Sequence, residues 1–189
     1  MQSHFVIEED SLTLGRFGES MDNHDRNTEG KAYLNLGIVC KSRSDLRKAI
    51  KRYERASNNA READDSSTRG RRYLNLGKVY ESRSDLPRAI RCYEKAMNNA
   101  REEGDRTTEG KAYLNLGMVH ISLSDLHKAI ECFEKASNNA REAGDKSTEG
   151  ETYLYLGVVY ISRSDLPKAI DCYEKSLHIA REACDPATE

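Results

Sequence analysis

Apolar residues along this chain recur at helical spacing, and they do so twice within each stretch of about forty residues. In the first stretch Tyr33, Leu36 and Cys40 follow the spacing of one helical face. A second, longer series follows the polar segment 42–45 and comprises Leu46, Ala49, Ile50, Tyr53, Ala56, Ala60 and Ala63. The two series predict helices near residues 26–42 and 46–64, joined as an antiparallel hairpin.

The whole pattern repeats with a period of 40 residues, so that Gly30, Gly70, Gly110 and Gly150 mark equivalent positions. The segment Tyr-Leu-Asn-Leu-Gly at 33–37 returns at 73–77 and 113–117, and as Tyr-Leu-Tyr-Leu-Gly at 153–157. A fixed period of this length indicates a stacked array, in which each unit buries its apolar face against its neighbours. We expect four repeats, at residues 26–64, 66–104, 106–144 and 146–184. An acidic leader at 1–25, flexible or partly helical, precedes them, and residues 185–189 start a truncated fifth repeat.

Aspartates at fixed repeat positions predict where the helices begin. Asp45 precedes the second helix of the first repeat, and its carboxylate can accept hydrogen bonds from the free amides of the first turn. In the second and fourth repeats Pro87 and Pro167 stand two residues after the equivalent Asp, where the missing amide hydrogen is tolerated. The first helices are predicted to start at the N-caps Asp25, Asp65, Asp105, Asp145 and Asp185.

A glycine stands in the middle of each first helix, where it costs about 1 kcal/mol relative to alanine. The four are Gly37, Gly77, Gly117 and Gly157. Their recurrence predicts a close approach of the two helices of each hairpin. We expect the partners on the second helix to be Ala49, Ala89, Ala129 and Ala169.

The order of these blocks resembles the tetratricopeptide repeat: an aromatic residue, Leu-Gly, then Ala-Ile, an aromatic residue and Ala. The resemblance covers residues 26–185, and the 40-residue period is similar to the Pins/LGN type of G-protein signalling modulator and to long animal arrays such as tetratricopeptide repeat protein 28. It implies an all-α fold, a right-handed superhelical solenoid of antiparallel helical hairpins, whose first helices line a concave peptide-binding groove. Ser44, Ser84, Ser124 and Ser164 replace the glycine usual at the turn. The motifs that bind G-protein α subunits are absent, so G-protein coupling is not carried over.

The resemblance also implies which residues face the groove, because they stand between the packing positions of the first helices. They are Lys31, Asn35, Ile38, Lys41, Arg71, Asn75, Lys78, Lys111, Asn115, Met118, Ile121, Tyr155, Val158 and Ile161. Asn35, Asn75 and Asn115 form a column of amides that can pair with the backbone of an extended peptide. Packing or helix capping explains a repeated asparagine equally well.

The character of this surface changes along the array. Its first half is basic and its second half is apolar, which predicts a protein or peptide ligand with an acidic segment joined to an apolar one. The alternative is that the apolar side chains pack against adjacent helices. Residues 30–69 carry ten basic and five acidic side chains, and residues 150–189 carry four and seven, so the charge also changes sign along the chain.

Composition limits the other possibilities. The formal net charge is −2, and basic residues crowd only the second helix of the first repeat, so a nucleic-acid partner is not expected. Neither a signal peptide nor a membrane span is recognisable, and we expect a cytoplasmic protein without a membrane partner. The five cysteines include no C-x-x-C pair and the five histidines have no zinc spacing, so no metal or cofactor is expected.

The sequence therefore predicts a non-enzymatic scaffold, in the manner of a signalling adaptor, that binds an extended or helical peptide. The alternative is a structural or self-assembling fragment of a longer array without its own ligand. Self-association is expected through the uncapped last repeat at residues 166–184, where Leu177 and Ile179 form an apolar pair.

Overall fold

The computed structural model describes residues 23–42, 45–62 and 66–184, and these form eight α-helices. The helices are α1 (Asn23–Ser42), α2 (Leu46–Glu62), α3 (Ser66–Ser82), α4 (Leu86–Glu103), α5 (Arg106–Ser122), α6 (Leu126–Glu142), α7 (Lys146–Ser162) and α8 (Leu166–Cys184). No helix within these ranges is both long enough and apolar enough to cross a lipid bilayer.

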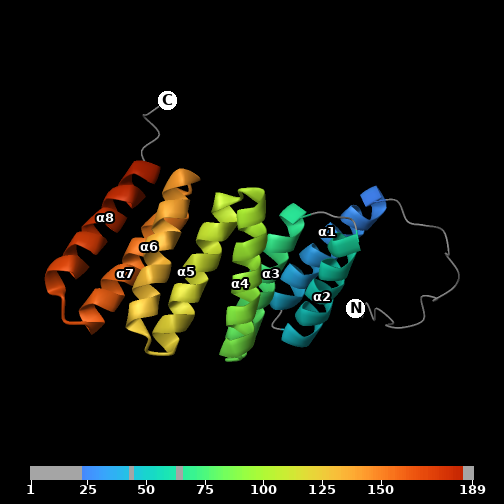
Figure 1. Cartoon of the computed structure of the whole chain (residues 1–189), viewed down its shortest axis with the longest axis horizontal. Coiled ribbons are helices and arrows are strands. Elements are labelled where there is room, and N and C mark those ends of the chain that lie inside the picture. Colours follow the sequence, from blue (N-terminus) through green and yellow to red (C-terminus); the bar gives the residue numbers. More distant parts are fainter. Residues whose placement is uncertain (1–22, 43–44, 63–65, 185–189) are drawn as a thin grey trace, which may run out of the picture.

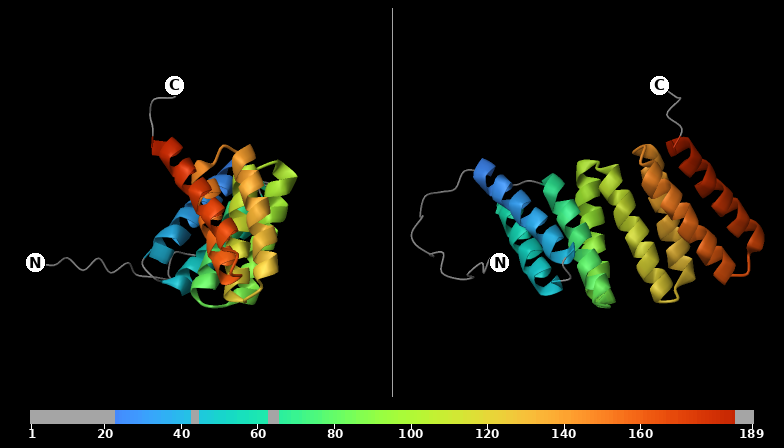
Figure 2. Two further views of the ribbon diagram at one scale, coloured as in Figure 1. Left: turned by 90° about the vertical axis from the view of Figure 1, so that its left-hand side faces the viewer. Right: turned by 180° about the vertical axis from the view of Figure 1, so that it is seen from behind.

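Consecutive helices pair as hairpins, and the hairpins stack side by side into an elongated array (Figures 1 and 2). The first helices α1, α3, α5 and α7 also contact one another in order along the array. Among the described residues, the second helices α2, α4, α6 and α8 make no such contacts with one another. The first helices therefore form the inner, more closely spaced layer. The predicted all-α solenoid of helical hairpins is confirmed.

Aspartate caps begin most of these helices, as the sequence predicted. Asp85 accepts a hydrogen bond from the amide of Arg88 at 3.3 Å, and Asp105 accepts one from the amide of Thr108 at 3.0 Å. Asp45, Asp125, Asp145 and Asp165 cap in the same way. The prediction for Asp25 is wrong, because α1 begins at Asn23 and Asp25 lies within the helix. Asp65 and Asp185 lie outside the described residues.

The mid-helix glycines make room for an aromatic ring of the second helix, and the expectation of an alanine partner is wrong. A Cβ atom built on Gly77 would overlap the ring of Tyr93 at Cε1. The same overlap pairs Gly37 with Tyr53, Gly117 with Phe133 and Gly157 with Tyr173. Tyr53, Tyr93 and Phe133 have no exposed surface, so each glycine lets one ring fill the centre of its hairpin.

The turn within each hairpin carries a serine in the left-handed region. Ser84, Ser124 and Ser164 have φ angles of 59°, 60° and 60°. A side chain in this region meets steric repulsion that glycine avoids. The substitution of serine for the usual glycine is therefore a local strain, repeated in three turns; Ser44 lies outside the described residues.

Candidate functional site

A pocket of about 440 Å³ lies on the inner surface, between α1, α3 and α5. Its lining residues are Ile38, Arg71, Leu74, Asn75, Asp105, Thr107, Thr108 and Lys111. Ile38, Arg71, Asn75 and Lys111 are among the predicted groove residues, so three successive first helices bring four of them together. The prediction missed four lining residues: Leu74, Asp105, Thr107 and Thr108. Of these, Asp105 was assigned only a capping role.

The two cations of this pocket differ in how free they are. Lys111 Nζ lies 3.1 Å from Oδ2 of Asp145, the cap of the next first helix. Arg71 is exposed and forms no ion pair with any residue that the structure describes. Arg71 is therefore the cation available to an anionic ligand, while Lys111 already forms an ion pair with Asp145.

The other predicted lysines lie farther along the inner surface. Burial lowers the pKa of Lys41, and the positive charge of Lys78 lowers it further, although Glu81 acts in the opposite direction. Glu81 accepts a hydrogen bond of 2.6 Å from the hydroxyl of Tyr93. The basic half of the groove thus contains a carboxylate. The side chain of Lys31 lies outside the described residues.

The three asparagines are not equivalent in the structure. Asn35 is exposed and Asn75 is half-buried, but Asn115 is only 6% exposed. Nδ2 of Asn115 donates to the backbone carbonyl of Lys111 at 2.6 Å, within its own helix. Packing and local hydrogen bonding therefore occupy Asn115, whereas Asn35 and Asn75 have amides accessible to a ligand.

The apolar half is also divided between packing and exposure. The ring of Tyr155 stacks on Phe133 of the preceding hairpin, with centroids 5.8 Å apart and planes 10° apart. Met118 and Ile121 are half-buried against the core. Val158 and Ile161 are 44% and 49% exposed, so they carry most of the free apolar surface in this half.

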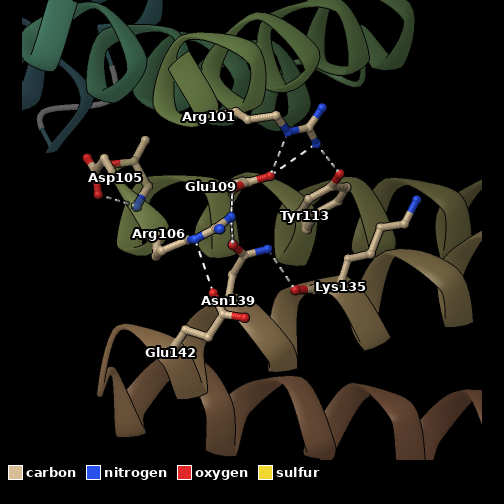
Figure 3. A network of polar contacts seen from close by, with 9 residues as sticks. Arg101, Asp105, Arg106, Glu109, Tyr113, Lys135, Asn139 and Glu142 are labelled. Atoms are coloured by element: carbon tan, nitrogen blue, oxygen red, sulfur yellow. Dashed lines mark hydrogen bonds and ion pairs between the residues drawn. The ribbon is translucent and has the colours of Figure 1, made fainter. Parts of the chain in front are cut away.

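A polar network around a buried glutamate joins three helices at the centre of the array (Figure 3). Glu109, on α5, is 3% exposed and accepts hydrogen bonds from Arg101 Nε on α4 and from Arg106 Nη1, each at 3.0 Å. Arg106 Nη1 also donates to Oδ1 of Asn139 on α6 at 3.3 Å. A similar pair joins Arg141 to Glu149 at 3.6 Å in the next junction. An Arg eight residues before a Glu, in two successive repeats, is the sequence signal for this link.

The described cysteines are free thiols with a packing role. They are Cys40, Cys92, Cys132 and Cys172, and the side chain of Cys184 at the end of α8 lies outside what the structure describes. Burial raises the pKa of Cys92 and Cys132 to about 11, which keeps both as neutral thiols at physiological pH. Within the described part of the chain, no three histidine, cysteine or acidic side chains gather as metal ligands would.

Comparison with sequence families matches the chain to the tetratricopeptide repeat over residues 24–102 and 108–182. These two segments cover most of the chain and include all eight helices in whole or in large part. A comparison with curated protein sequences finds no significant match.

Several solved structures share the fold at low sequence identity. BtubC (BKLC) from P. vanneervenii is 22% identical with a TM-score of 0.76, over 87% of this chain and 68% of that chain. Aspartyl phosphate phosphatase F from Bacillus subtilis is 16% identical with a TM-score of 0.80, over 86% of this chain and 43% of that chain. A putative kinesin light chain from Podosopora anserina, with nearly identical TPR-like repeats, is 11% identical with a TM-score of 0.65, over 80% of this chain and 75% of that chain. At these identities the similarity shows the fold alone.

Proposed function

Because the chain belongs to the tetratricopeptide repeat family, whose members are generally non-catalytic protein-interaction modules, we propose that it binds a peptide segment of a protein partner on its inner surface. The pocket between α1, α3 and α5 is the observation that carries this proposal. It combines a cation without an ion pair in the described part of the chain, a half-buried amide and two apolar side chains: Arg71, Asn75, Ile38 and Leu74.

This combination favours an acidic side chain next to an aliphatic one. The guanidinium of Arg71 can bind a carboxylate through two parallel hydrogen bonds, and Asn75 can pair with the peptide backbone. Ile38, 43% exposed, offers apolar surface within the same pocket, whose lining also includes the buried Leu74. Farther along, Val158 and Ile161 extend the apolar surface for a longer ligand. Cytoplasmic location and a signalling role stay predictions of the sequence.

Selection of peptides from a displayed random library on the intact chain tests the proposal. Selected peptides should contain Asp or Glu beside an aliphatic residue, and their affinity should fall with added salt, since exposed charges are screened over about 8–10 Å. Arg71→Glu should abolish binding, and Asn75→Ala should weaken it by about 1 kcal/mol, one net hydrogen bond.

Arg91→Glu is the matched control, because Arg91 is exposed on α4 of the outer layer and the change in charge is the same. It should leave binding intact. Equal loss of affinity in Arg71→Glu and Arg91→Glu would show that overall charge, rather than the pocket, determines binding. Selected peptides without acidic residues, unaffected by Arg71→Glu, would place the ligand elsewhere.

A further inference from the structure

The last hairpin presents an open apolar surface on α7 and α8. Leu154 is 48% exposed, although the same repeat position is buried elsewhere, in Leu34 at 8%, Leu74 at 8% and Leu114 at 5%. In those repeats a following hairpin packs against the helix that carries the leucine. A pocket of about 510 Å³ adjoins Leu154 and is also lined by Gly150, Ile179 and Ala183. The sequence pointed only to α8, and the structure adds α7 to this surface.

The first hairpin presents the opposite surface on α1. Leu36 is 44% exposed, whereas the same position is buried in Leu76 at 7%, Leu116 at 6% and Leu156 at 5%. Ala32 and Thr28 are exposed, whereas Ala112 and Thr108 are buried. In the later repeats the helix that carries these positions packs against the preceding hairpin. Helix α1 therefore has the residues of a packed first helix without a described hairpin in front of it.

The junctions inside the array show how two such surfaces fit together. A Cβ atom built on Gly70 would lie 3.3 Å from Cγ2 of Thr108 in the next repeat, so this threonine packs closely on the glycine. At the open ends the same two repeat positions are occupied by Gly150 and Thr28. The two open surfaces thus carry the same close-packing pair as an internal junction.

Charge is complementary in the same register. Arg101 and Arg141 each pair with a glutamate on the following first helix, at 3.0 Å and 3.6 Å. Arg181 holds this position in the last hairpin and forms no ion pair with a residue in the described ranges. The sequence has a glutamate, Glu29, at the corresponding position of the first repeat.

We propose that a second copy of this chain docks its α1 on the α7–α8 surface, head to tail, and so continues the stack of hairpins. The contact joins two different surfaces and leaves one of each free on the resulting dimer. Heterologous contacts of this kind do not close unless the rotation between subunits closes a ring. Growth should therefore continue past the dimer. This inference concerns the ends of the array and does not depend on the inner pocket.

Sedimentation velocity of the full chain over rising concentration provides the test. The weight-average mass of the native chain should rise steadily without stopping at a dimer. Leu36→Glu and Leu154→Glu should each be monomeric, because each blocks one of the two surfaces. An equal mixture of the two variants should form a dimer and nothing larger, because one intact surface of each kind remains.

Leu123→Glu is the matched control, since Leu123 is 49% exposed at the end of α5 and belongs to neither surface. It should assemble like the native chain, and circular dichroism should show all three variants equally helical. A native chain that stays monomeric at every concentration would overturn the proposal. So would a mixture of the two blocked variants that forms no dimer, or a control that is blocked as completely as they are.

Discussion

The tyrosines at the centre of the hairpins allow one substitution to be tested with opposite expected signs. Tyr93 donates a hydrogen bond of 2.6 Å to Glu81, whereas the hydroxyl of the equivalent Tyr53 is buried and has no hydrogen-bond partner among the residues that the structure describes. Lys41 stands in the first repeat where the second has Glu81, so the acceptor is replaced by a donor. Burial raises the pKa of Tyr53 to about 12, which keeps this hydroxyl protonated.

The magnitudes follow from the hydrogen bonds. A hydrogen bond to a charged acceptor contributes roughly 1.5–3 kcal/mol, and a buried polar group without a partner costs roughly 1–3 kcal/mol. Tyr93→Phe should therefore lower the free energy of unfolding by about 1.5 kcal/mol, at the lower end because Glu81 is only half-buried. Tyr53→Phe should raise it by about 1 kcal/mol, because the ring keeps its packing and loses only the unpaired hydroxyl.

The third repeat provides an independent comparison. Phe133 occupies the same position, and Ile121 stands where Glu81 would be. Phe133→Tyr should lower the stability, since the added hydroxyl has no acceptor at that position. Urea unfolding followed by circular dichroism measures all three variants. A change of the unfolding midpoint in the same direction for Tyr53→Phe and Tyr93→Phe would refute these assignments, and so would a stabilising effect of Phe133→Tyr.

Three further predictions concern strain, acid and thiol chemistry. Ser84→Gly or Ser124→Gly should raise the free energy of unfolding by about 0.5–1 kcal/mol, because relief of the left-handed strain outweighs the greater freedom that glycine gives the unfolded chain. The control Ser82→Gly, within α3, should lower the free energy of unfolding, and thermal melts measure the stability of each variant. Burial alone would raise the pKa of Asp145, but hydrogen bonds from Thr148 and Lys111 hold it below the ordinary 3.8. Its stabilising charge is thus fully present above pH 3.8 and lost as the pH falls through the lower folded value, so Asp145→Asn should be less stable than the native chain at neutral pH and approach it in acid. Cys92, with its pKa raised by burial, should react with a disulfide reagent at neutral pH only as fast as the array unfolds, and rapid modification of the native chain would contradict this.

The period made the hairpins and their caps predictable, because both depend on residues close in sequence. Asp85 and Arg88 lie within one turn, so the cap could be recognised from spacing alone. The ring that fills the space beside Gly77 was missed, since helical periodicity does not tell which side chain of the second helix reaches it. It was assigned to alanine because small residues suggested a close backbone approach.

The groove was less predictable, because it depends on how successive repeats are rotated relative to one another. The spacing within one repeat placed Asn75 and Asn115 in the same role, yet Asn115 is buried and Asn75 is accessible to a ligand. The ion pair between Lys111 and Asp145 joins residues that are 34 positions apart and lie on different hairpins. Such pairs follow from the stacking geometry, which a single repeat does not encode.

Amide and methyl chemical-shift mapping of the intact chain with a selected acidic peptide tests the central claim most directly. The largest shifts should fall on Ile38, Leu74, Asn75 and Thr108, around the pocket on the inner layer. Arg71→Glu should remove these shifts at the same peptide concentration. Shifts concentrated on the outer helices α4 and α6, with the inner pocket unchanged, would contradict it.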